Sequence, residues 1–379
     1  MPKFIGNRFG SVVPISAGND APSAVYNAHD QYYAKKIGGW TVSGIQGASG
    51  GTLVSPNPGG MEIRHFPSTG SGSFTYTSAT PDAELQVVVV GGGGGGGERG
   101  GGGGGGGGVI YWDAVPLSGL TAGPVTIPLS VGAGGEGKTN GPPTVGGDAG
   151  TPTTFANPST QPGIYLVALG GGGGLSDSAN APNNAPGTSP TPQQGRGGSG
   201  GGQHECTDGQ VTDGNGVQTS DPNIPANSRT HGFGNPGGRA NPSAPDGEGC
   251  PLIGGGGGGA GGGRPGNDAK SPSPQAGGAG GPGIGPPTIP WMPTSLGDSG
   301  YFGGGGGGGV HGPPSTGGEG GQGGGGDALG RSGPFGGNPG TNGTGGGGGG
   351  SSVNNSFDPS SGTSGDGGNG IIVIRYPAV

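Results

Sequence analysis

Residues Gly132–Thr139 read GAGGEGKT and match the phosphate-loop pattern G-x-x-x-x-G-K-[ST]. In such a loop the backbone N–H groups wrap the phosphates, and the Lys and Thr open a helix. Here Gly141-Pro142-Pro143 follow closely, and proline cannot continue a helix. Because 112 of the 379 residues are glycine, composition alone supplies the two fixed glycines of the pattern. The sequence therefore predicts a scaffold segment here and no nucleotide binding.

A second local grouping that could do chemistry is His204-Glu205-Cys206, with His231 and Cys250 further along the chain. These residues could supply zinc ligands, but their spacing fits no standard zinc finger. A Cys/His nucleophile pair would need a rigid cleft, whereas the surrounding residues are turn formers. We expect no metal, no cofactor and no enzymatic activity. Cys206 and Cys250 could form a loop-closing disulfide or remain two free thiols, and the sequence leaves both alternatives open.

The composition excludes several classes of protein. With 26% hydrophobic residues and 39 prolines, most of the chain cannot build a hydrophobic core of the usual kind. The net charge of −8 argues against binding to a nucleic-acid backbone, which needs clustered Lys and Arg. The sequence contains no apolar run long enough for a membrane span, and MPKFIGNRFG lacks the apolar region of a signal peptide. We expect neither nucleic-acid binding nor membrane insertion.

Residues 1–40 have an ordinary composition and are interpreted as an N-terminal attachment segment. A short helix is expected from about Ser23 to Lys36, ended by Gly38-Gly39. The segment is rich in aromatic residues, which would form either a small packed cap or a docking surface for a partner: Tyr26, Tyr32, Tyr33 and Trp40.

Residues 41–90 are predicted to form short antiparallel strands and turns, because β-branched and alternating stretches are broken by Gly, Pro and Asn. The last of these strands, residues 84–90, runs directly into a block of glycines. Further strands are predicted at 109–112, 126–131, 163–169 and 371–376. Helical periodicity is absent after the N-terminal segment, so the fold class is mostly irregular and β.

Glycine blocks dominate residues 91–379, which we expect to form one bundle closed by the strand at 371–376. Some blocks are pure glycine: 91–97, 100–108, 170–174, 254–259, 303–309 and 345–350. Others keep one side chain in every third position: Ala133 and Glu136, Arg196 and Ser199, Ala279 and Pro282, Glu319 and Gln322, Asp366 and Asn369. A period of three is that of polyproline-II-like helices, which have no internal hydrogen bonds.

All-glycine helices of this kind can approach closely enough to pair their backbone groups with neighbours. Helices in the interior would then need glycine at every position, whereas outer helices could keep a side chain outward. The sequence predicts a bundle of polyglycine-II helices joined by long loops. The alternative is a disordered glycine-rich linker, which the composition alone favours. The phased triplets and the flanking strands favour the bundle. If residues 87–90 pair with 371–376, both ends of the glycine region lie at the same end of the molecule.

Two stretches resemble known phage proteins. The order FTYTSATPDAELQVVVVGGGGGGG, PLSVGAGGEG and finally GDGGNGIIVIRY resembles the glycine-rich domain of bacteriophage tail-fibre and other virion proteins, over roughly residues 71–379. AVYNAHDQYYAKKIGGW is similar to an N-terminal segment of phage virion structural proteins, particularly those of marine phages. The first resemblance implies an adhesin whose polyglycine-II bundle displays receptor-binding loops. A capsid or tail decoration protein without host contact would use the same scaffold, and the long β-region before the bundle departs from the adhesin pattern.

The resemblance implies a location in the virion, attachment to other virion proteins through the N-terminal segment, and a host surface glycan or outer-membrane protein as receptor. A homo-oligomer is also compatible with it. Receptor contacts are expected from aromatic and apolar residues on the loops: Trp291, Met292, Tyr301, Phe302, Phe233, Phe335 and Phe357. The alternative is that these residues cap the ends of the bundle.

Overall fold

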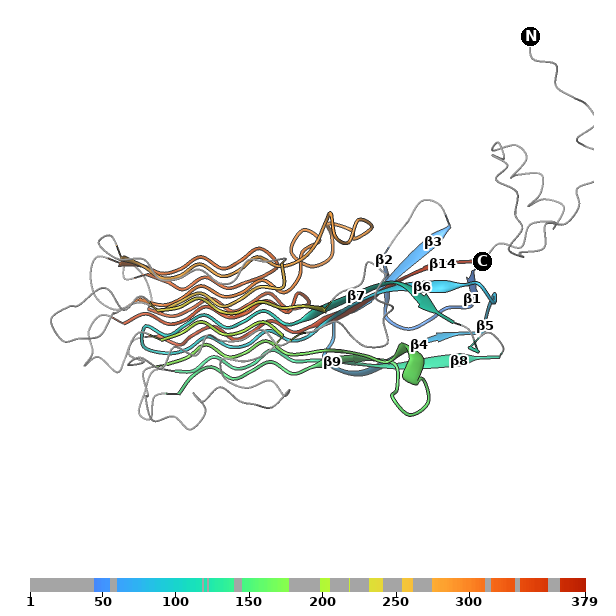
Figure 1. Ribbon diagram of the computed structural model, residues 1–379, viewed down its shortest axis with the longest axis horizontal. Coiled ribbons are helices and arrows are strands. Elements are labelled where there is room, and N and C mark those ends of the chain that lie inside the picture. The colour runs from blue at the N-terminus through green and yellow to red at the C-terminus, as the bar shows by residue number, and fades with distance from the viewer. Residues whose placement is uncertain are drawn as a thin grey trace, which may run out of the picture.

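The computed structural model describes residues 44–54, 60–117, 119–120, 123–139, 145–176, 198–204, 218, 232–240, 254–261, 275–310, 315–330, 335–353 and 362–379. These residues form mostly irregular structure with antiparallel β-sheets, and they contain no α-helix. Figure 1 shows the strands gathered at one end of an elongated molecule, while extended glycine segments run side by side to the other end. The expected N-terminal helix, Tyr26, Tyr32, Tyr33, Trp40, Cys206, Cys250 and Phe357 lie outside the described residues.

The strands occur where β-branched and aromatic residues interrupt the glycine-rich sequence. They are β1 (Ile45–Gln46), β2 (Thr52–Val54), β3 (Met61–Phe66), β4 (Gly70–Tyr76), β5 (Ser78–Ala79), β6 (Glu84–Val90), β7 (Val109–Pro116), β8 (Val125–Val131), β9 (Thr153–Phe155), β10 (Leu166–Ala168), β11 (Gly232–Phe233), β12 (Gln275–Ala276), β13 (Ser315–Thr316) and β14 (Ile371–Pro377). The strands expected at 84–90, 109–112, 126–131 and 371–376 are confirmed as β6, β7, β8 and β14. The strand expected at 163–169 is shorter, because Pro162–Ile164 form the 3-10 helix η2 before β10.

Two larger sheets contain most of these strands. Their orders are β11-β7-β6-β14-β3-β2 and β10-β9-β8-β4, and the neighbours in both are antiparallel. The short β12–β13 pair is parallel, so the expectation of antiparallel strands fails there. The last strand, β14, lies between β6 and β3 in the six-stranded sheet. Strands that precede residue 90 and strands that follow it therefore share one sheet. The expected boundary between the β-region 41–90 and the glycine-rich region 91–379 crosses this sheet.

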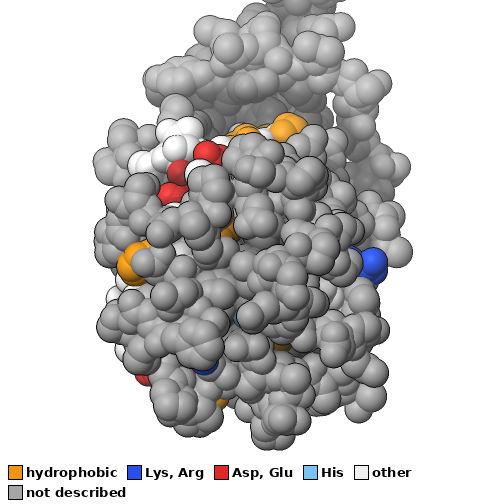
Figure 2. All heavy atoms as spheres, turned by 90° about the vertical axis from the view of Figure 1, so that its left-hand side faces the viewer, with side chains coloured by type: hydrophobic (Ala, Val, Ile, Leu, Met, Phe, Trp, Pro, Cys, Tyr) orange, Lys and Arg blue, Asp and Glu red, His pale blue; other side chains and the backbone are white. Residues whose placement is uncertain are grey.

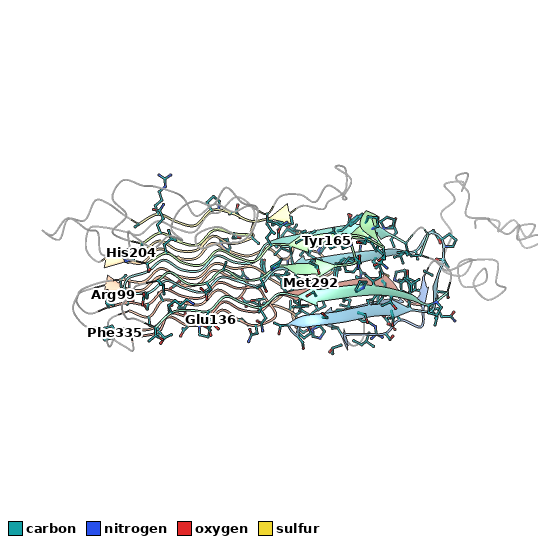
Figure 3. The ribbon with its side chains drawn as sticks, turned by 90° about the horizontal axis from the view of Figure 1, so that it is seen from below. Arg99, Glu136, Tyr165, His204, Met292 and Phe335 are labelled. Carbon is teal, nitrogen blue, oxygen red and sulfur yellow. The ribbon has the colours of Figure 1, made fainter. Side chains whose placement is uncertain are left out.

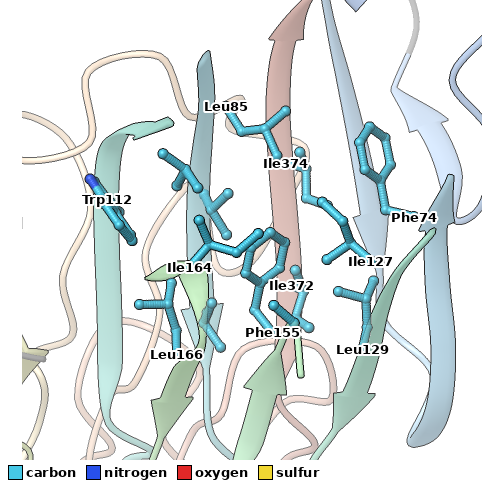
Figure 4. Packing of buried hydrophobic residues seen from close by; sticks show 14 of the residues in the cluster. Phe74, Leu85, Trp112, Ile127, Leu129, Phe155, Ile164, Leu166, Ile372 and Ile374 are labelled. Atoms are coloured by element: carbon cyan, nitrogen blue, oxygen red, sulfur yellow. The ribbon is translucent and has the colours of Figure 1, made fainter. Parts of the chain in front are cut away.

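The main hydrophobic core lies between the two sheets (Figure 4). Because side chains alternate along a strand, Val87 and Val89 point into this core, as do Ile372 and Ile374 of β14. Val88, Val90 and their neighbours on β14 and β7 point to the opposite face of the sheet. These residues are buried too, so the central strands β6, β7 and β14 are apolar on both faces.

The second face is covered by residues 284–302, which leave the glycine bundle and fold back over the six-stranded sheet. Ile289, Met292 and Phe302 from this segment pack against a row of sheet residues that comprises Ile63, Val88, Val90, Val109, Tyr111, Ile371 and Val373. Figure 1 shows the segment as the orange loop beside the sheets. Residues 284–302 thus form a third layer, which covers the face of the six-stranded sheet opposite the main core.

Backbone hydrogen bonds join each glycine segment to several others. Within 91–97 the partner changes with every residue and repeats after three. Gly91, Gly94 and Gly97 donate to the segment 100–108, at N···O distances of 3.0, 2.9 and 2.9 Å. Gly92 and Gly95 donate to residues 148–151, and Gly93 and Gly96 to residues 365–368. Three further segments donate back to 91–97 through Gly135, Gly171, Gly174, Gly348 and Ser351. Residues 91–97 are therefore surrounded by six neighbours.

Close approach explains why the interior segments carry no side chains. A Cβ added to Gly93, Gly94 or Gly95 would lie within 3.0 Å of a carbonyl oxygen of a neighbouring segment, a separation that real Cβ atoms do not tolerate. All the pure glycine runs are buried, as the sequence predicted. The outward positions are also confirmed for Ala133, Glu136, Glu319, Gln322 and Asp366, which are exposed.

Ser199 is an exception to the predicted outward positions. It is completely buried, and residues 198–203 bond to four other glycine-rich segments. These neighbours are 100–108, 169–175, 232–240 and 254–261. The triplet pattern identified an outer position, but the arrangement of the neighbouring segments placed this one inside.

Candidate functional site

The molecule has two chemically different ends. Gly44 and Val379 lie together at the sheet end, where Ile45 bridges Ala378 and Val379 N–H donates to Ile45 O at 3.2 Å. At the opposite end the chain turns through Glu98, Arg99 and Gly100. The pairing of β6 with β14 fixes this polarity, since it returns both ends of the glycine region to the sheets. Residues 1–43 are therefore joined to the protein at the sheet end.

The turn at Glu98–Gly100 is held by polar contacts among neighbouring segments. Arg99 N–H donates to Ser351 Oγ at 3.0 Å, and Gly100 N–H donates to Ser351 O at 2.8 Å. Glu98 is fully buried and accepts a hydrogen bond from Val145 N–H. His204 is also buried, with Nε2 3.0 Å from Arg99 O. These contacts fix the conformation of the turn. The sequence did not indicate Glu98 and Ser351, because no motif marks them.

Figure 3 places Arg99, His204 and Phe335 at this turn end and Met292 close to the sheets. Figure 2 looks directly onto the turn end, where hydrophobic, acidic and basic side chains are visible among the described residues. A surface that mixes these types can offer both apolar contacts and hydrogen bonds to a partner.

Several of the predicted receptor-contact residues lie elsewhere. Phe302 and Met292 are buried in the cluster that covers the six-stranded sheet, at 0% and 5% exposure. Trp291 and Phe233 are partly buried against the same cluster. The alternative that such residues cap the sheet end of the bundle fits these four. The expected loop position holds for Trp291, Met292 and Phe302, whereas Phe233 lies on β11, and the sequence could not show that the loop 284–302 folds back on the sheet.

Trp291 is also fixed by polar contacts. Its Nε1–H donates to Tyr111 Oη at 3.1 Å, and the Arg375 guanidinium lies 5.8 Å from the centre of its ring. Tyr301 Oη donates to Pro286 O at 2.9 Å, which ties the loop to itself. Phe335 is half-buried at the turn end, so it is the one described candidate that the fold places there.

The former phosphate-loop candidate is an outer glycine segment. It follows β8, and Lys138 forms an ion pair with Asp148 instead of facing an open loop. Thr139 bridges Thr363, and Lys138 N–H donates to Ser364 Oγ at 2.7 Å. Residues 145–152, the next described stretch, contain no helix. The groups that would bind phosphate are occupied by other segments of the bundle.

A shallow groove of about 330 Å³ runs along the flank of the bundle. It is lined by glycine backbone and by Glu136, Pro339, Asn342, Asp366 and Asn369. Figure 3 shows Glu136 on this flank, between the two ends of the molecule. Within the described ranges no group of three or more His, Cys, Asp or Glu side chains is arranged to hold a metal ion. Those same ranges contain no helix with the length and apolarity that crossing a membrane requires.

Comparison with known proteins agrees with this architecture. No curated protein matches the chain. The model of a family described as glycine-rich domain matches residues 68–377. This range includes β4, the central strands of both larger sheets and every described glycine segment after β6. Since this match spans most of its 379 residues, the chain belongs to the glycine-rich domain family.

Proposed function

We propose that the chain is a bacteriophage virion protein, a tail-fibre tip or adhesin that presents receptor-binding loops on a bundle of polyglycine-II helices. The observation that carries this proposal is the polarity of the molecule. The aromatic-rich segment that resembles virion attachment sequences joins at the sheet end, and the turn that contains Arg99 lies at the far end (Figure 3). A protein built this way can hold a particle with one end and meet a host surface with the other.

The polyglycine-II assignment rests on the hydrogen bonds of the buried glycine segments. Donation to a different neighbour at each of three successive residues is what a helix with three residues per turn and no internal bonds requires. Six neighbours around residues 91–97 correspond to the packing of such helices in a bundle. The scaffold itself offers almost no side chains, so recognition falls to the connections.

The partner at the turn end is proposed to be a host surface glycan or outer-membrane protein. Phe335 supplies an aromatic surface there, and Arg99 lies in the same region. The experiment is an adsorption assay with virions that lack this chain and virions that carry it. Loss of adsorption, restored by adding the chain back, supports the adhesin; normal adsorption without the chain contradicts it.

A second candidate is a structural decoration of the capsid or tail without host contact. The burial of Phe302 and Met292 against the sheet favours it, because these residues stabilise the protein and are not presented to a receptor. Labelling the chain and locating it in images of the particle separates the two functions. A position on the capsid shell or tail tube supports the decoration role, and a position at a fibre tip supports the adhesin.

A further inference from the structure

The outermost glycine segments have fewer neighbouring segments to accept their backbone N–H groups than the interior segments have. Each N–H group of residues 91–97 donates to the carbonyl of a neighbouring segment, whereas the flank has fewer neighbouring segments among the described residues. Segment 362–370 bonds to 91–97, 132–138, 335–343 and 345–350, whereas 91–97 has six neighbours among the described residues. The groove of about 330 Å³ lies over 362–370, with segments 132–138 and 335–343 as its walls. No glycine segment among the described residues fills this groove.

Side-chain oxygens take up the N–H groups at this groove. Gly134 N–H donates to Asn369 Oδ1 at 3.1 Å, and Gly137 N–H donates to Asp366 Oδ1 at 2.7 Å. The two donors, Gly134 and Gly137, are three residues apart, and so are the two acceptors, Asp366 and Asn369. This side-chain capping of an N–H group therefore repeats once per turn of a helix with three residues per turn. In the reverse direction Gly367 and Gly370 donate to backbone carbonyls of segment 132–138, at 2.8 and 2.9 Å. The two segments are therefore joined by one backbone ladder and one side-chain ladder.

The same arrangement recurs on other outer segments. Asn369 N–H donates to Asn342 Oδ1 at 3.0 Å, on the other side of the groove. Gly320 N–H donates to Asp327 Oδ1 at 2.7 Å, and Ala133 N–H donates to Thr151 Oγ1 at 2.7 Å. Asp, Asn and Thr thus appear where the backbone lacks a carbonyl partner. An outer polar residue in the triplet pattern substitutes for a missing neighbour.

We propose that Asp366 and Asn369 close the flank groove against a glycine segment from a second copy of the chain. A glycine segment with free N–H groups is open to lateral addition in the same way as the edge of a sheet. Here the two side chains accept from the N–H groups and line the space above them.

The test compares three variants with the wild type by sedimentation analysis over a range of concentrations. The D366G/N369G double variant removes the caps and opens the groove, so its average mass should rise with concentration above that of the wild type. The D366A/N369A double variant also loses the oxygens but keeps a Cβ in the groove. It should melt at a lower temperature yet keep the wild-type mass. D366N keeps the accepting oxygen and should match the wild type in both.

A folded D366G/N369G protein with wild-type mass at every concentration would overturn the proposal, as would equal self-association of D366A/N369A. If the glycine variant does not fold, amide hydrogen exchange in D366A/N369A decides instead. The amides of Gly134 and Gly137 should then exchange faster than in the wild type, while Gly135, which donates to Gly93 O at 2.8 Å, stays protected. Unchanged exchange at Gly134 and Gly137 would equally reject the capping role.

Discussion

Val90 and Ile371 lie opposite each other in antiparallel strands, although the whole glycine region separates them in the sequence. Each is the residue at which its strand meets a glycine segment, since Gly91 follows Val90 and Gly370 precedes Ile371. The pair therefore acts as a clamp: the chain first enters the bundle and finally leaves it at adjacent positions on the apolar sheet. Because glycine is the costliest residue to order, this clamp limits the freedom of the segments between its two strands.

The interior of the bundle should reject even one added methyl group. In Gly104→Ala the new Cβ would come within 3.0 Å of Gly94 O, in a segment surrounded on all sides. We expect a loss of about 1–3 kcal/mol or more in the free energy of unfolding, measured by chemical denaturation. Glu136→Ala, at an exposed outer position, is the matched control and should leave the stability nearly unchanged. Equal stability of the two variants would contradict the close packing of the segments.

The two ends of the molecule should respond differently to loss of an aromatic ring. Phe302→Ala removes a fully buried ring and should cost about 3–5 kcal/mol of stability. Phe335→Ala, at the turn end, should leave the melting temperature close to that of the wild type and reduce binding to host cells. Thermal melting and a cell-binding assay on both variants check this prediction. A stable Phe302→Ala protein would remove the structural role assigned to the 284–302 segment.

Alkaline pH should weaken the sheet region through two buried tyrosines. Burial raises the pKa of Tyr76 and of Tyr376 to about 12, from 10.0. The folded protein holds these protons more tightly than the unfolded chain, so the stabilisation is complete below pH 10 and is lost as the pH rises towards about 12. Each tyrosine should contribute a slope of about 1.4 kcal/mol per pH unit in that range.

The Tyr376→Phe variant separates the two contributions. Tyr376 Oη donates to Glu62 and accepts from Arg64 Nε at 2.8 Å, so its loss should cost about 1 kcal/mol at neutral pH. Above pH 10 the variant should lose stability at about half the wild-type slope. Denaturant titrations from pH 8 to pH 12 measure this. An unaltered slope would mean that Tyr376 does not titrate as a buried group.

Mild acid should weaken the same sheet through His65 on β3. Burial lowers the pKa of His65 below its usual 6.5, and Nδ1 is buried without a hydrogen-bond partner. The unfolded chain therefore binds the proton more readily than the folded protein. The stabilisation is complete above pH 6.5 and is lost as the pH falls below that value. His65→Gln should flatten the stability profile between pH 7 and pH 5; a profile identical to that of the wild type would exclude His65 as the cause.

The phosphate-loop residues should behave as surface scaffold. Lys138 pairs with Asp148 on the outside of the bundle, so Lys138→Ala should cost no more than about 1 kcal/mol. ATP with magnesium should not raise the melting temperature of the wild type, whereas a ligand at a hundred times its Kd would add about 2.7 kcal/mol. A rise that disappears in Lys138→Ala would show that the motif binds nucleotide after all.

The sequence by itself determined the local structure. Runs of β-branched residues specified β6 and β14, since such residues suit a strand whose two faces are buried, and the alternating pattern of residues 125–131 specified β8, which is buried on one face. The pure glycine runs specified buried segments, and a side chain in every third position identified the outward positions of Ala133, Glu136 and Asp366. These features depend only on residues close to one another in the chain.

Only the tertiary structure decided which segments are neighbours. Extended glycine segments are nearly identical in chemistry, so nothing in their sequence selects one partner over another, and the burial of Ser199 depends on which segments surround it. The fold-back of 284–302 over the sheet likewise reflects an apolar surface assembled from β6, β7 and β14, which are distant in sequence. Phe302 therefore lies in a hydrophobic core, while Asp366 and Asn369 lie on the flank of the bundle, where their side chains accept hydrogen bonds from Gly137 and Gly134.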